Sequence, residues 1–247
     1  MDRLIYTAMT GAKHAFLRQA GVAHNLANAS TTGYRSQEHQ FRAVQLQGEG
    51  FPTRAFTVDA SVKDVMDQGP MSYTGRSLDV AVQGKGWIAV QGADGKEAYT
   101  RDGNFQVNAN GQLQTKAGLN VVGEGGPITV PPDSRVTIGP DGTVSVVSTY
   151  GVPNTVNTLG RLKLVNPPEN QLTRGADGLF RTRDGQEQAA DPAVSLATET
   201  LEGSNVNVVD AMVSLISISR QFETQIKLVQ TAEQMDKSAQ PLLTLSS

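Results

Sequence analysis

The sequence predicts an α+β protein in which long N- and C-terminal helices pair as a coiled-coil-like hairpin beside a central all-β domain of barrel or sandwich type. Three observations predict this class. An amphipathic segment opens the chain at about residues 3–27, and a longer one closes it at about residues 207–238. Between them the sequence shows short β patterns punctuated by glycine, with 25 Gly in 247 residues.

The N-terminal helix is predicted from a row of apolar residues that recurs at helical spacing. Its members are Ile5, Met9, Ala12, Phe16, Ala23 and Leu26. Small residues in and beside this row would let a second helix approach closely. The following segment, 25–35, is rich in Asn, Ser and Thr, so we expect the helix to end near Asn28 and the chain to turn at Gly33 with positive φ.

Residues 37–67 carry few strong signals, and we expect an extended, partly irregular segment. Gly48, Gly50 and Pro52 predict a loop within it. From Gly69 onward, apolar residues alternate in short runs that predict β-strands. The expected strands are 78–82, 87–90, 97–101, 104–107, 112–115, 120–122, 128–130, 135–138, 143–147, 159–165, 179–182 and 194–198. Turn dipeptides separate several of them, at Asn110-Gly111, Asp141-Gly142 and Asp177-Gly178.

The C-terminal helix is predicted from apolar residues at alternating spacings of four and three, the period of a helix that buries a seam against another helix. These residues are Val208, Met212, Leu215, Phe222, Ile226 and Val229, with Ser219 in the one polar slot. A second row, Val209, Val213 and Ile216, widens the apolar face over the first half. Asn205 or Asn207 is the expected N-cap.

Two interpretations of the terminal helices remain open. They pair only with each other, or they pair and also pack against other subunits. On the second interpretation the two rows named above, together with Asn28 and Gly33 of the loop, form an assembly interface. The expected domains are an N-terminal helix in 1–34, a linker in 35–69, the β domain in 70–200 and a C-terminal helix in 201–247.

Composition narrows the classes of function. A net charge of −3 without a long Lys/Arg run argues against binding to nucleic acid or to an anionic membrane surface. The sequence has no apolar run long enough for a transmembrane helix. Its Cys count of 0 excludes disulfides and thiolate chemistry. The N-terminus lacks the pattern of a cleavable secretory signal, so we expect a cytoplasmic chain or one exported without cleavage.

No catalytic constellation emerges, and we expect no catalytic, cofactor-binding or metal site. Residues 84–89 spell G-x-G-x-x-A, but a dinucleotide fingerprint needs a helix after the glycines, and Trp87–Val90 has a strand pattern. His14 and His24 would lie about 15 Å apart along one helix and could not share a metal ion. The acidic residues are scattered singly, mainly in turns such as Asp94-Gly95 and Asp102-Gly103.

Four segments resemble the family of flagellar rod and hook proteins, and the resemblance they carry extends over essentially the whole chain. The N-terminal one is 25–35, Asn-Leu-Ala-Asn-Ala-Ser-Thr-Thr-Gly-Tyr-Arg. The C-terminal one begins with Leu-Glu-Gly-Ser-Asn-Val-Asn at 201–207 and continues to Arg-Gln-Phe-Glu at 220–223. The central ones are 74–87 and 99–105. The opening 1–12 is most similar to that of proximal rod members, and a distal rod or hook-type member is the alternative within the family.

The resemblance implies a structural subunit that is not an enzyme and has no cofactor. It implies assembly through the terminal helices into a periplasmic tube that transmits torque and encloses the export channel. The implied partners are copies of the chain, other proximal rod subunits, the distal rod protein and the flagellar type III export apparatus, which exports without a cleavable signal. A ligand-binding β module whose helices merely dimerise is the competing hypothesis from another class.

Overall fold

The computed structural model describes residues 2–45, 55–148 and 156–244, and the chain divides into two compact units. The first, here called the helical unit, comprises Met1–Ala29, Ser36–Val65 and Val206–Ser247. The second, the β unit, comprises Ser30–Arg35 and Met66–Asn205. The loop expected around Gly48, Gly50 and Pro52 lies outside the described residues.

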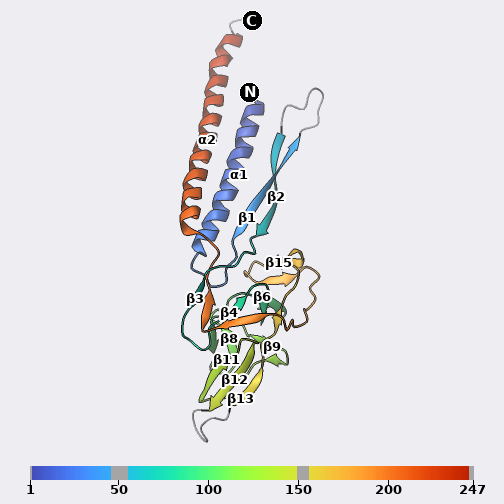
Figure 1. Cartoon of the computed structure of the whole chain (residues 1–247). Helices are drawn as coiled ribbons and strands as arrows, with labels where there is room; N and C mark the ends of the chain where they lie inside the picture. The colour runs from blue at the N-terminus through green and yellow to red at the C-terminus, as the bar shows by residue number, and fades with distance from the viewer. Residues whose placement is uncertain (1, 46–54, 149–155, 245–247) are drawn as a thin grey trace. The chain divides into compact units, whose positions relative to one another are not determined.

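The helical unit contains α1, Asp2–Ala27, and α2, Val208–Thr244, which lie side by side (Figure 1). Strands β1, Gln37–Gln45, and β2, Ala55–Asp64, form an antiparallel hairpin that also contacts α1. The two helices agree with the sequence prediction. The pairing of β1 with β2 was not predicted, because their mixed polar and apolar residues gave no clear period.

The ends of the helices follow from local chemistry. The side-chain oxygen of Asn207 accepts hydrogen bonds from the amides of Val209 at 3.0 Å and Asp210 at 3.4 Å, so Asn207 is the N-cap of α2. At the end of α1, the side-chain Nδ2 of Asn28 donates to the carbonyl of His24 at 2.9 Å. Both boundaries lie close to the predicted ones.

The β unit is built from short strands joined by tight turns (Figure 1). They are β3 Met71–Tyr73, β4 Val80–Gln83, β5 Trp87–Gln91, β6 Glu97–Thr100, β7 Phe105–Val107, β8 Leu113–Thr115, β9 Val122–Gly123, β10 Gly126–Pro127, β11 Ser134–Ile138, β12 Thr143–Ser148, β13 Val156–Arg161, β14 Leu164–Val165, β15 Leu172–Arg174, β16 Phe180–Thr182, β17 Ser195–Thr198 and β18 Thr200–Glu202, with a 3₁₀ turn at Glu169–Gln171. Gly111, Gly142 and Gly178 have φ of 77°, 84° and 80°, which confirms the three predicted turn dipeptides.

The sheets of the β unit are small and open. The largest has the order β14-β5-β6-β16-β15, and the next has the order β11-β12-β13. The remaining strands pair two by two: β17 with β4, β18 with β3, β7 with β8 and β10 with β9. Among the described strands no sheet closes on itself, so the barrel alternative is wrong: each sheet keeps two edges, and closure requires the first and last strands to pair.

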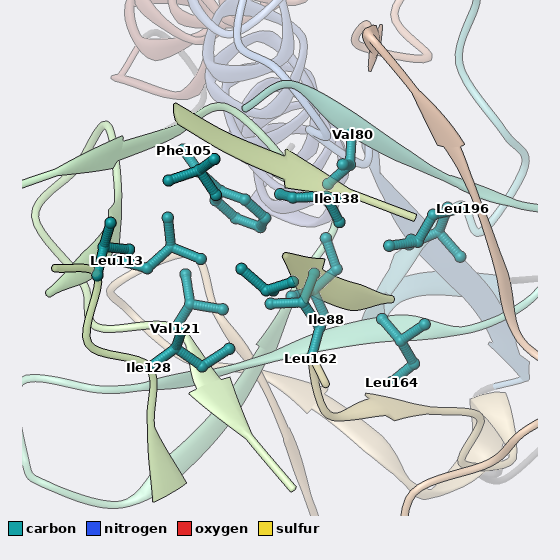
Figure 2. Close-up of a cluster of buried hydrophobic side chains, with 14 of the residues drawn as sticks. Val80, Ile88, Phe105, Leu113, Val121, Ile128, Ile138, Leu162, Leu164 and Leu196 are labelled. Carbon is teal, nitrogen blue, oxygen red and sulfur yellow. The ribbon is translucent and has the colours of Figure 1, made fainter. Parts of the chain in front are cut away.

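The β unit contains three apolar clusters, and Figure 2 shows the one with the most buried residues. Its side chains come from many strands and include Phe105, Leu113, Ile88, Leu162 and Leu196, all fully buried. Each such side chain contributes roughly 1.5–3 kcal/mol when it leaves water. Strands β11 and β12 alternate buried residues with half-buried or exposed ones, which places one face on this core. The sequence pattern predicted both strands, because alternation is visible without knowledge of the partner strand.

The two ends of the β unit meet in space although they are far apart in sequence. Strand β17 pairs with β4, aligning Leu196 with Val82, and β18 pairs with β3, aligning Glu202 with Met71. Neither β3 nor β18 was predicted. Each has only three residues, and each forms a strand because it pairs with a partner more than a hundred residues away in the sequence.

Candidate assembly surface

Among the side chains of the two helices whose burial is described, alanines make up most of the buried apolar residues. They are Ala8, Ala12 and Ala15 of α1 and Ala211 and Ala232 of α2, and Ile218 of α2 is buried with them. Between these positions of α2, Leu215, Phe222 and Val229 are half-buried. A Cβ atom on Gly11 would lie 3.0 Å from the Gln225 side chain, so α1 and α2 approach closely there. Small residues permit this approach because they place little bulk between the helix axes.

Large apolar side chains are left in solvent on the first turns of α2. Val208, Val209, Met212, Val213 and Ile216 form a strip, here called the exposed strip, with exposed fractions from 40% to 68%. Ile216 lies two residues before the buried Ile218, which places them about 160° apart around the helix. The exposed strip therefore faces away from the buried side of α2. On α1, Tyr6, Met9 and Phe16 are also exposed, by 56% to 66%.

Beyond Ile216 the same side of α2 becomes charged. Arg220, Glu223 and Lys227 follow at helical spacing, and all three are exposed. The exposed strip thus spans about 12 Å along the helix before the surface changes character. Contiguous apolar surface with a polar border is typical of a binding surface, whereas single exposed apolar residues are common and need no explanation.

The residues predicted for the interface differ in burial: some are buried or half-buried, and others face solvent. In the N-terminal row Ala12 is buried, Ile5 and Leu26 are half-buried, and Met9, Phe16 and Ala23 are exposed. In the C-terminal row Leu215, Phe222 and Val229 are half-buried, whereas Val208, Met212 and Ile226 are exposed. Heptad spacing selected large apolar residues, but the helices bury mainly alanines. That these residues contact other subunits remains a prediction.

Specific hydrogen bonds fix the loop after α1 at Gly33 and anchor the start of β1 at Asn25. Gly33 has a φ of +67°, as predicted, and its amide donates to the carbonyl of Glu202 at 2.8 Å. Within the helical unit, Asn25 pairs with the backbone of Gln37: its Nδ2 donates to the Gln37 carbonyl at 2.8 Å, and its Oδ1 accepts from the Gln37 amide at 2.9 Å. Asn25 thus orients the start of β1.

A buried cluster of charges, which sequence reasoning missed, lies in the β unit. Arg35 Nη1 is 2.6 Å from Glu202 Oε1, and Arg101 Nη1 is 3.1 Å from Glu202 Oε2. The three side chains are exposed by only 1%, 0% and 4% in the order Arg35, Glu202, Arg101. Each of the three residues lies in one of the segments that carry the family resemblance. The signal in the sequence that could have identified them is a charged residue placed among turn and apolar residues.

Burial lowers the pKa of Arg101, and the neighbouring Arg35 charge acts in the same direction, while Glu202 opposes both. The guanidinium stays charged because its ordinary pKa is so high. Arg101 also donates to the carbonyls of Val82 at 3.3 Å and Gly84 at 2.7 Å, and it lies 5.3 Å from the centre of the Trp87 ring. These contacts are those of a structural ion cluster and offer no reactive group.

Across the described part of the chain, neither helix is both long enough and apolar enough to span a membrane. Within the same residues, no three His, Cys, Asp or Glu side chains lie close enough together to hold a metal ion.

Comparison with known proteins places this architecture in one class. Residues 5–35 match the model of flagella basal body rod proteins, residues 81–146 match the D1 domain of the flagellar hook proteins FlgE/F/G, and residues 197–242 match the C-terminal region of the basal body rod FlgEFG proteins. The three matches follow the order helix, β unit, helix, so the class is that of rod- and hook-type flagellar proteins.

Full-length relatives narrow the class to a family. The chain is 46% identical to the flagellar basal-body rod protein FlgF of Salmonella typhimurium and 45% identical to that of Escherichia coli, with 100% of each chain covered. It is 31% identical to the rod protein FlgG of Agrobacterium fabrum, over 94% of this chain and 96% of the relative. The chain therefore belongs to the flagellar basal-body rod protein family.

Proposed function

We propose that this chain is a structural subunit of the flagellar basal-body rod and is not an enzyme. Its relatives across the full length are rod proteins by name, and one family model covers each end of the chain. FlgF relatives are 46% and 45% identical and the FlgG relative is 31% identical, which supports a proximal position in the rod rather than the distal one.

The exposed strip carries the proposal for how the subunit assembles. Residues of this size stabilise an interface by roughly 1.5–3 kcal/mol each when fully buried, and in the isolated chain they remain in solvent. Packing them against the helices of a neighbour would remove them from water. Contacts of this head-to-tail kind propagate as a filament when the rotation between subunits does not close a ring.

The finer proposals follow from the same surface. α1 and α2 pair as a coiled-coil-like hairpin, and the predicted interface residues on both helices contact copies of the chain and other rod proteins, including FlgG. The assembled helices form a tube that transmits torque and encloses the export channel. The chain reaches the periplasm through the flagellar type III export apparatus, without a cleavable signal.

Ile216→Asp tests this function. Ile216 is 56% exposed, so the carboxylate remains hydrated in the isolated subunit and the stability should change by less than about 0.5 kcal/mol. In an assembled interface the same charge would be buried without a partner. We expect a normally folded chain that is absent from isolated basal bodies, and cells that do not swim.

Ser217→Asp is the matched control, because Ser217 is the next residue, is also exposed and lies outside the exposed strip. It should assemble like the wild type. Incorporation of the Ile216 variant at wild-type levels would contradict assembly through this face. Light scattering of the purified wild-type chain separates the competing hypothesis: a stable dimer would favour a β module dimerised by its helices, and a monomer favours the rod subunit.

A further inference from the structure

Glu202 joins three separate segments of the β unit. Besides the two arginines, its Oε1 accepts a hydrogen bond from the Gly69 amide at 3.1 Å, and its carbonyl accepts one from the Gly33 amide at 2.8 Å. Arg35 Nη1 in turn donates to the Asp67 carbonyl at 2.7 Å. Residues 30–35, 66–69 and 200–205 are thereby tied to a single carboxylate.

These three segments are the places where the chain passes between its two units. Residues 30–35 form an isolated stretch of the β unit, residue 66 begins its main part and residue 205 ends it. The segments that lead to α1, to the β1–β2 hairpin and to α2 are therefore all held at Glu202. This is a property of connectivity, independent of how the units are oriented.

The three segments lie outside the apolar core. Among the described residues, none of the apolar clusters includes a residue of 30–35 or 200–205, and from 66–69 only Met66 packs against one. Tyr34 is buried, and the Arg174 guanidinium lies 4.5 Å from the centre of its ring. Regions with few apolar contacts open locally at a lower free energy than the core does.

The charge count makes Glu202 the critical member of the cluster. Two guanidinium groups are buried with one carboxylate, and Arg35 Nε, Arg35 Nη2 and Arg101 Nε have no hydrogen-bond partner among the described residues. Arg174 does not relieve this imbalance, because it is a third cation and donates to the Arg35 carbonyl at 2.8 Å. Loss of the carboxylate would leave two buried charges uncompensated.

We propose that Arg35, Glu202 and Arg101 form a clasp, a local conformational device that opens and closes as one unit. When the clasp is closed, the three segments are bound. When it opens, they are released together while the apolar core stays folded, and the free chain between the β unit and the helices lengthens. One consequence rests on the proposed function. In an assembled subunit, the closed clasp shortens the path through which force reaches the β unit.

Native-state hydrogen exchange of the purified full-length chain tests the clasp without any variant. The amides of Gly33 and Gly69 report on the clasp, and those of Leu113 and Leu162, which donate to Ile128 and Gly142, report on the core. We expect Gly33 and Gly69 to share one opening equilibrium that is at least about 10-fold more favourable than that of the core amides. Equal protection of all four amides would overturn the proposal.

Glu202→Gln keeps the shape and the acceptor for Gly69 but removes the charge. Exchange at Gly33 and Gly69 should accelerate by at least about 100-fold, with a much smaller change at Leu113 and Leu162. Glu97→Gln is the matched control, since it breaks a partly buried ion pair of the same unit, Lys163–Glu97 at 2.6 Å, which involves none of the three segments.

The Glu97 variant should leave Gly33 and Gly69 at wild-type rates. Unchanged rates at these amides in the Glu202 variant would overturn the clasp, as would equal acceleration at all four. If the Glu202 variant does not fold, the wild-type measurement still decides. Because exchange is measured on unassembled protein, failure of the rod assignment would not affect the result.

Discussion

Gly33 shows how much one residue without a side chain can determine. Besides its φ of +67°, a Cβ atom there would lie 2.4 Å from the Arg101 carbonyl carbon and 2.6 Å from the Asp102 nitrogen. Both neighbours are backbone atoms, so the clash cannot be relieved by rotating a side chain. The glycine therefore serves two purposes, a left-handed turn and a close approach of two backbone segments of the β unit.

We expect Gly33→Ala to destabilise the β unit by about 2–4 kcal/mol, from the positive φ and the overpacking together. Gly118→Ala is the control: Gly118 has a φ of +84° but nothing lies within 4 Å of its Cβ position, so only about 1–2 kcal/mol should be lost. Urea unfolding followed by fluorescence of the single tryptophan, Trp87, measures both. Equal losses would show that the contact with Arg101 is unimportant.

Two aspartates should shift stability with pH in opposite directions. Burial raises the pKa of Asp102 above its ordinary 3.8, whereas the hydrogen bond from Arg181 lowers the pKa of Asp177 below the same value. A raised folded-state pKa means that stability falls as pH rises from 3.8 through that pKa. A lowered one means that stability present above pH 3.8 is lost as pH falls through the folded-state pKa.

Asp102→Asn should therefore raise the melting temperature at pH 7, with a gain that disappears in acid. Its amide oxygen can still accept the hydrogen bond that Asn104 N makes to Asp102 Oδ1. Asp177→Asn should lower the melting temperature at pH 7, and this loss should shrink at pH 2, because protonation of the wild-type carboxyl removes the same stabilisation. Melting curves at both pH values give the test, and changes of the same sign for the two variants at pH 7 would refute the assignment.

At the scale of elements, alanine packing sets the contact between the terminal helices. Ala12→Leu would insert a larger side chain at a buried position of α1, and such overpacking costs about 1–3 kcal/mol. Ala20→Leu, on the exposed side of the same helix, should be nearly neutral. Thermal loss of helical circular dichroism in the two variants makes the comparison, and equal melting temperatures would show that Ala12 is not part of a tight contact.

The elements also show where sequence reasoning succeeds. Strands β5, β11 and β12 were predicted almost residue for residue, because their apolar periodicity and flanking turns lie within a few positions of one another. The end of α1 and the start of α2 were predicted because asparagines such as Asn28 and Asn207 mark helix termini chemically, whereas α2 continues to Thr244, beyond the predicted end near residue 238. Local signals of this kind do not depend on the rest of the chain.

The same reasoning fails where a partner decides. Strands β3 and β18 exist because they pair with each other across the chain, and β1 exists beside β2 and α1. Heptad spacing identified the terminal helices but not which of their residues face each other: α1 and α2 bury mainly alanines, whereas Met212 and Ile226 are exposed in the single chain. Glu202 was missed because its role needs two arginines that lie 167 and 101 residues upstream.

At the scale of the whole molecule, the chain is discontinuous in its units. The β unit takes residues 30–35, leaves out 36–65 to the helical unit, and resumes at 66. Closing such an excursion costs little entropy, because that cost grows only with the logarithm of loop length. The arrangement makes the boundaries of a stable fragment predictable, since residues 30–35 must be kept with the β unit although they follow directly on the first helix.

We therefore expect a fragment of residues 30–205 to unfold cooperatively without the helices. A fragment of residues 36–199, which retains the apolar core but lacks Arg35 and Glu202, should also unfold cooperatively and be about 3 kcal/mol less stable, because Arg101 loses its buried partner. Urea titration of both fragments, again followed by Trp87 fluorescence, supplies the measurement. A non-cooperative transition in 30–205 would show that the helices are needed to fold the β unit. Identical midpoints would show that residues 30–35 and 200–205 contribute nothing to it, although they meet the rest of the unit at Glu202.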